Sequence, residues 1–156
     1  MSATLSTTII EEITLNGNKT RLVNSKSIVG VNSIFTRIIA LPPSQSTTLA
    51  MFQTSEHTAD GALDLEDTKY IRITNTHATE QVTLSLQVAG GEGGTANMSA
   101  SVLLDAGKSF MLGPVHDGIS VGDADATVIT ALTDLESIVA VCGSTVVSLE
   151  LFIATA

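Results

Sequence analysis

Short segments that alternate apolar with polar residues recur along the chain, most regularly between residues 69 and 88. One parity there holds Lys69, Ile71, Ile73 and Asn75, and the other holds Tyr70, Arg72 and Thr74. The period of two returns at Val82, Leu84, Leu86 and Val88. Successive side chains of a strand point to opposite faces, so this alternation predicts half-buried antiparallel strands.

The same pattern predicts further strands at residues 4–15, 19–23, 27–31, 34–41, 47–54, 99–104, 108–112, 127–132, 136–141 and 146–153. Asn16-Gly17 is a strong hairpin signal, because both residues tolerate the positive φ angles of a tight turn. A helical turn within residues 126–137 is the alternative for one segment, where four aliphatic residues come close to helical spacing. Such a series of short strands predicts an all-β chain.

We therefore expect one domain over residues 1–156, built as an antiparallel β-sandwich or a jelly roll. Residues 1–24 are expected to form an N-terminal arm or hairpin. With 156 residues the chain is long enough to bury a core without metals or disulfides. Only 3% of the residues are aromatic, so Ile, Val and Leu must build that core.

The surface is expected to be rich in hydroxyl groups and poor in charge. Ser and Thr supply 37 residues, whereas charged residues make up 15% of the chain. Solubility of a free monomer normally relies on charge. This composition therefore predicts a surface partly covered by neighbouring copies in a homo-oligomer. The expected homo-oligomer is a trimer.

Charge is distributed unevenly along the chain. The formal net charge is −9, and residues 1–54 hold four basic and two acidic side chains. The excess of acid elsewhere argues against nucleic acid as a partner, because phosphate binding relies on clustered Lys and Arg. Either the acidic part is simply a solvated face, or the N-terminal third docks on another subunit. The predicted partner-binding residues are Ile9, Ile10, Ile13, Lys19, Arg21 and Lys26.

No catalytic motif is complete in the sequence. Gly107-Lys108-Ser109 resembles the end of a phosphate-binding loop, but the required glycine is replaced by Val102. His116-Asp117 has no nucleophile elbow to act on. We expect no enzymatic activity, no catalytic residue and no cofactor.

Metal binding has weak support in the sequence. His57, His77 and His116 lie far apart, each in a polar turn. Acidic residues gather at Asp60, Asp64, Glu66 and Asp67, and again at Asp123 and Asp125. These loops either hold a structural Ca²⁺ or are only solvated, and neither matches the twelve-residue calcium loop. The lone Cys142 lies in an apolar run and is expected to be a small buried residue.

The chain shows neither a signal-peptide pattern at residues 1–8 nor an apolar run long enough to span a bilayer. We therefore expect synthesis in a reducing cytoplasm and no membrane partner.

Three passages carry a resemblance to a known class of proteins. They are Ile13-Thr14-Leu15-Asn16-Gly17, Tyr70-Ile71-Arg72-Ile73-Thr74-Asn75 and Leu104-Asp105-Ala106-Gly107-Lys108-Ser109-Phe110. Their style resembles small virion structural proteins of tailed bacteriophages, particularly those of marine and cyanobacterial phages. Such proteins tend to be β-sandwiches or jelly rolls that decorate capsids as trimers or attach to tail parts.

The resemblance implies a virion location and binding to the major capsid protein or another virion protein. Capsid decoration, in the manner of a cement protein, is the expected function. A tail, baseplate or fibre-associated module is the alternative in a neighbouring class. A carbohydrate-binding β-sandwich is the alternative in a different class, and the scarcity of aromatic platforms counts against it.

Overall fold

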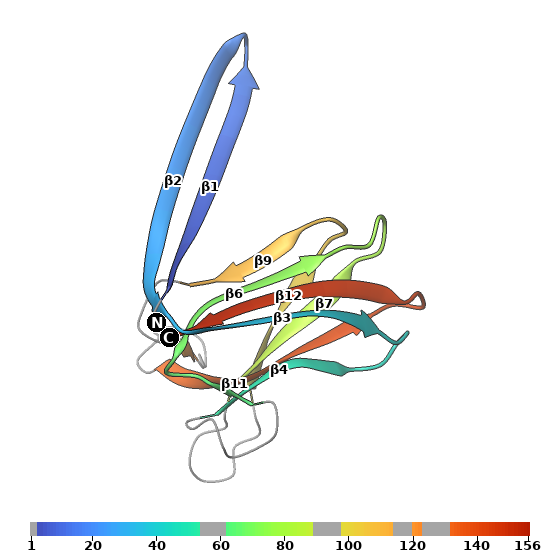
Figure 1. The fold of residues 1–156 in the computed structure, drawn as a ribbon. Helices are drawn as coiled ribbons and strands as arrows, with labels where there is room; N and C mark the ends of the chain where they lie inside the picture. The colour runs from blue at the N-terminus through green and yellow to red at the C-terminus, as the bar shows by residue number, and fades with distance from the viewer. Residues whose placement is uncertain (1–2, 54–61, 89–97, 114–119, 123–131) are drawn as a thin grey trace.

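The structure is a computed structural model that describes residues 3–53, 62–88, 98–113, 120–122 and 132–156. These residues contain strands and turns but no helix. Two sheets pack against each other, and a separate two-stranded hairpin projects from one end (Figure 1). The prediction of an all-β, sandwich-like chain is confirmed, whereas the strand order does not establish a jelly roll.

One sheet has the strand order β5-β4-β11-β7-β8, with β10 paired to β11. Its strands are β4 (Thr47–Gln53), β5 (Leu63–Asp64), β7 (Val82–Val88), β8 (Met98–Leu104), β10 (Ser120–Gly122) and β11 (Leu132–Cys142). Its pairs are antiparallel except for β4 and β5, which run parallel over two residues.

The other sheet is fully antiparallel in the order β3-β12-β6-β9. It consists of β3 (Ser33–Leu41), β6 (Thr68–Asn75), β9 (Ser109–Leu112) and β12 (Val147–Thr155). Each strand has one face toward the core and one face outward. We call the outward side of these four strands the outer face.

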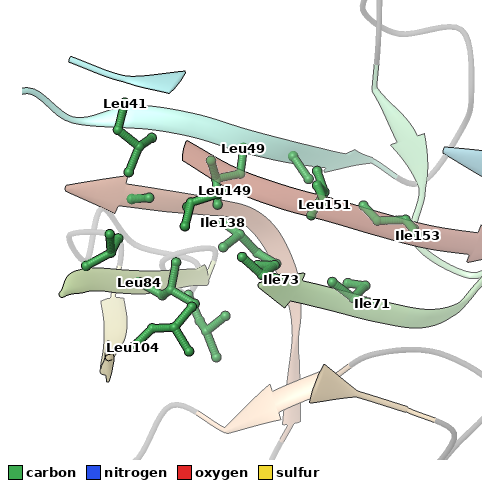
Figure 2. Close-up of a cluster of buried hydrophobic side chains, with 14 of the residues drawn as sticks. Leu41, Leu49, Ile71, Ile73, Leu84, Leu104, Ile138, Leu149, Leu151 and Ile153 are labelled. Carbon is green, nitrogen blue, oxygen red and sulfur yellow. The ribbon is translucent and has the colours of Figure 1, made fainter. Parts of the chain in front are cut away.

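The core lies between the two sheets and is almost entirely aliphatic (Figure 2). Ile71 and Ile73 of β6 and Leu149, Leu151 and Ile153 of β12 are fully buried. From the opposite sheet, alternate positions of β7 and β11 meet them, including Leu84 and Ile138. The predicted parity of residues 69–75 and 82–88 is confirmed, because the residues with odd numbers in β6 and even numbers in β7 point inward.

A buried asparagine at the end of β6 links the two sheets. The Asn75 amide donates hydrogen bonds to the carbonyl oxygens of Glu80 at 2.8 Å and Leu104 at 3.2 Å. Its side-chain oxygen accepts a hydrogen bond from the His77 backbone N–H at 3.0 Å. These bonds satisfy a polar group that would otherwise be costly to bury.

The hairpin consists of β1 (Ala3–Leu15) and β2 (Asn18–Val31), and we call it the arm. Asn16 and Gly17 turn the chain with φ angles of 50° and 81°, as expected for the predicted tight turn. Gly30 has a φ of 82° and no partner in the register, which jumps from Ala3–Val31 to Thr4–Val29. This β-bulge lies where the arm leaves the sandwich, and bulges bend the strand that carries them.

The structure corrects two expectations about local structure. Residues 19–23 and 27–31 belong to one continuous strand, so the arm extends to Val31 rather than to residue 24. Residues 132–137 are strand and not a helical turn, because β11 pairs there with β10 and β7. The rest of the predicted strand at 127–132 lies outside the described residues.

Candidate interaction surface

The arm has two faces with different chemistry. Cross-strand partners lie on the same side of a hairpin and successive pairs alternate between sides. Leu5 and Ile28 form one such pair, and they pack with Tyr70 and Ala154 of the sandwich. This contact fixes the base of the arm and defines its inner face, on the side of Leu5 and Ile28. The opposite side is the arm's back.

Beyond its base, the inner face of the arm carries a line of uncovered aliphatic side chains. These residues are 50–64% exposed: Ile9, Ile13, Leu15 and Leu22. The back carries Ile10, Val23 and Val29, which are also exposed. A two-stranded hairpin is at best marginally stable alone, so this exposed apolar surface is typical of a segment that packs against a partner.

The six residues predicted to bind a partner all lie on the arm, but not on one face. Ile9, Ile13 and Lys26 belong to the inner face, whereas Ile10, Lys19 and Arg21 belong to the back. Lys19 Nζ lies 2.9 Å from Glu12 Oε1, and Arg21 Nε lies 3.7 Å from Glu12 Oε2. The two cations of the back are therefore already paired within the arm, and Lys26 lies on the opposite side.

A groove of about 740 Å³ opens between the arm and the outer face. The inner face of the arm contributes Ile9, Asn24 and Lys26 to its lining, and the sheet contributes Tyr70, Arg72 and Met111. Figure 1 shows the arm diverging from the sandwich toward its tip.

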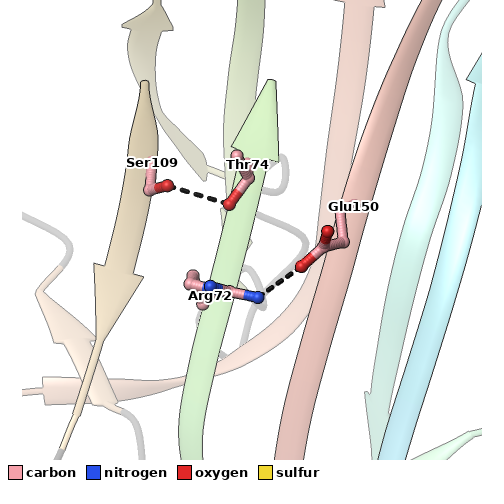
Figure 3. Close-up of polar contacts among 4 residues, drawn as sticks. All are labelled: Arg72, Thr74, Ser109 and Glu150. Carbon is pink, nitrogen blue, oxygen red and sulfur yellow. Dashed lines mark hydrogen bonds and ion pairs between the residues drawn. The ribbon is translucent and has the colours of Figure 1, made fainter. Parts of the chain in front are cut away.

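The outer face combines polar pairs with exposed apolar residues. Arg72 of β6 forms an ion pair with Glu150 of β12, and Thr74 shares a 2.8 Å hydrogen bond with Ser109 of β9 (Figure 3). The Arg72 guanidinium also lies over the Phe152 ring, 5.8 Å from its centroid. These contacts hold the side chains in the middle of the outer face in place.

Apolar side chains surround that polar centre. Ile34 and Ile38 of β3 and Met111 of β9 are exposed on the outer face, and Ile38 is 72% exposed. Phe152 is half-buried, since the base of the arm covers one side of it. The outer face is thus a second exposed apolar surface, adjacent to the arm.

The other candidate residues have structural roles where the structure describes them. His77 Nδ1 accepts the backbone N–H groups of Thr79 at 3.2 Å and Glu80 at 2.9 Å, which holds the turn before β7. Cys142 is buried, as predicted, with its thiol 3.3 Å from the Pro42 carbonyl oxygen. Gly107 has a φ of 69° in the turn between β8 and β9, where Lys108 N–H donates to the Asp105 carbonyl at 3.2 Å.

The acidic loops are only partly described. Asp64 Oδ1 accepts the Glu66 backbone N–H at 3.0 Å, which caps the turn into β6. No three His, Cys, Asp or Glu side chains converge as metal ligands within the part of the chain that the structure describes. The remaining candidates lie outside the described residues: His57, Asp60, His116, Asp117, Asp123 and Asp125. None of the described segments is a helix long and apolar enough to cross a membrane.

Sequence reasoning did not identify the outer face as a candidate surface. Its apolar residues come from strands that are far apart in the chain, and the pairing order β3-β12-β6-β9 brings them together. The available signal was the parity of Ile34 and Ile38, which is opposite to that of the buried Leu41 of the same strand.

Comparisons with protein-family models, with curated proteins and with solved structures find no match to this chain.

Proposed function

We propose that the protein is a virion structural protein of a tailed bacteriophage. It decorates the capsid as a homo-oligomer and acts as a cement between the subunits of the capsid. The observation that carries this proposal is the arm, a long hairpin with exposed aliphatic side chains on both faces. A segment of this kind fits a protein that is completed by assembly, since its apolar residues gain from burial only when a partner covers them.

The surface of the sandwich supports the same proposal. The outward positions of β7 and β8 are rich in hydroxyl and amide groups, with Thr83, Ser85, Gln87, Ser99 and Ser101. Such a surface can bind a protein lattice through hydrogen bonds and shape complementarity, without the desolvation cost of buried charges. The resemblance of the chain to small phage virion proteins supplies the virion location and the capsid partner.

A location on the tail, baseplate or fibre is the second candidate, because an apolar arm serves assembly there equally well. The two locations differ in copy number. Mass spectrometry with absolute quantitation of purified particles that encode this chain is expected to find hundreds of copies per particle.

A dozen copies or fewer would move the protein from the capsid to the tail. Absence of the protein from purified particles, with the major capsid protein as the internal reference, would contradict the virion proposal.

A further inference from the structure

We infer that the arm of one copy packs through its inner face onto the outer face of a second copy of the same chain. This inference rests on the proposed function and deepens it, because it names the first partner of the arm and the two surfaces that meet.

The inner face of the arm and the outer face of the sandwich belong to one chain, and neither covers the other. The arm's base packs on Tyr70 and Ala154, but the residues beyond it diverge from the sandwich (Figure 1). The inner face therefore leaves Ile9, Ile13 and Leu22 uncovered, and the outer face leaves Ile38 and Met111 uncovered. A second copy supplies the missing cover for both surfaces at once.

The arm is long enough to make an extended contact. β1 and β2 contain 13 and 14 residues, so the arm is about 40 Å long at about 3.3 Å per residue. A standard protein interface uses about 20–30 residues on each side. Only one side of the arm makes the contact, so a single arm contributes about half of these residues, and each copy reaches the standard size when it both inserts its own arm and receives another.

Charge favours a contact through the arm over a contact between two sandwiches. Residues 3–31 carry three basic and two acidic side chains, whereas residues 32–156 carry four basic and fourteen acidic side chains. Two whole copies repel each other through their acidic sandwiches. The inner face carries one charge of each sign, Glu11 and Lys26, and the centre of the outer face carries the Arg72–Glu150 pair, so a contact between these two surfaces avoids the repulsion between the acidic sandwiches.

The two surfaces also match chemically along the contact. The inner face alternates its aliphatic residues with Thr7, Thr20 and Asn24, and the outer face sets its aliphatic residues around Arg72 and Glu150. Both surfaces are therefore mixed, with apolar residues beside hydrogen-bonding groups. An arm-to-face contact joins two different surfaces, and repetition of such a contact closes into a ring when the rotation between copies allows it.

Complementation between two defective chains tests the inference. In the arm-shortened chain, residues 8–25 are replaced by Asn-Gly, so that Thr7 and Lys26 flank the turn with the same parity as Leu15 and Asn18. In the face variant, the arm is intact but the outer face carries Ile38→Asp and Met111→Asp. Each chain alone is expected to be a monomer by light scattering, and their equimolar mixture is expected to give a heterodimer of about twice the single-chain mass.

The matched control places the same charges on the other sheet. Met51→Asp and Leu103→Asp change residues of similar exposure outside the outer face, at 43% and 57%. This control chain is expected to assemble as the intact protein does, and thermal unfolding verifies that every variant is folded. Assembly of the face variant at the level of the intact chain would overturn the inference, and so would a mixture that stays monomeric.

The outcome is independent of the virion proposal. Abundant protein in purified particles, together with normal assembly of the face variant, would remove only the contact between copies. A successful complementation with no protein in particles would remove only the virion location.

Discussion

Shortening the arm is expected to convert the assembled protein into a folded monomer. The change is the replacement of residues 8–25 by Asn-Gly, which removes Ile9, Ile13, Leu15 and Leu22 from the inner face. Full burial of an aliphatic side chain is worth about 1.5–3 kcal/mol, and these side chains are already partly covered. At about 1 kcal/mol each, their loss weakens self-association by roughly 1000-fold.

The sandwich is expected to survive this change. No residue of the arm belongs to the main core cluster, and the base contact of Leu5 and Ile28 remains. Sedimentation velocity measures the loss of assembly, and thermal unfolding measures the stability of the sandwich. A shortened chain that assembles as well as the intact protein would show that the arm is not the assembling segment.

Leu151→Ala is expected to cause the largest loss of stability among single substitutions. Leu151 is fully buried in β12, the strand that pairs with both β3 and β6 at the centre of its sheet. Removing a buried leucine side chain costs about 2–5 kcal/mol, because apolar contacts are lost and a cavity remains. For a chain of this length, we expect the unfolding midpoint to fall by about 10 °C.

The arm-shortened monomer is the right background for this measurement, since the stability of an oligomer depends on its concentration. Ile38→Ala is the matched control: it truncates an aliphatic residue of the neighbouring strand β3 that is 72% exposed. Its expected effect is within about 0.5 kcal/mol. Equal losses for the two substitutions would contradict the assignment of inner and outer positions in this sheet.

The strands of the sandwich could be predicted because burial on one face imposes a period of two. Residues 69–75, 82–88 and 147–153 show that period, and each forms a strand with the predicted face inward. The Asn16-Gly17 turn could also be predicted, since it depends on the backbone preferences of two adjacent residues. The properties of residues adjacent in the sequence were sufficient to predict these strands and this turn.

The length and the separation of the arm could not be predicted in the same way. Beyond its base, the arm is exposed on both faces, so β2 has no period that would join residues 19–23 to 27–31. The segment at 132–137 was ambiguous because a register shift between Leu135 and Ser137 breaks the alternation of β11. Where burial does not impose a period, sequence patterns do not define the strand.

The candidate site was predicted only in part, for a related reason. Ile9, Ile10 and Ile13 stand out in the sequence because they are aliphatic residues near a turn. Their division between two faces depends on the register of β1 with β2. The outer face depends on long-range pairing, since Ile38 and Met111 are 73 residues apart in the chain and share one sheet.

The mass of the intact protein in solution is the most direct test of self-assembly through the arm, because packing of one copy's arm on another copy requires more than one copy. Light scattering across a range of concentrations is expected to give a stable multiple of the 16.1 kDa chain, three for the trimer. A mass equal to one chain at every concentration, with the sandwich folded, would contradict the account.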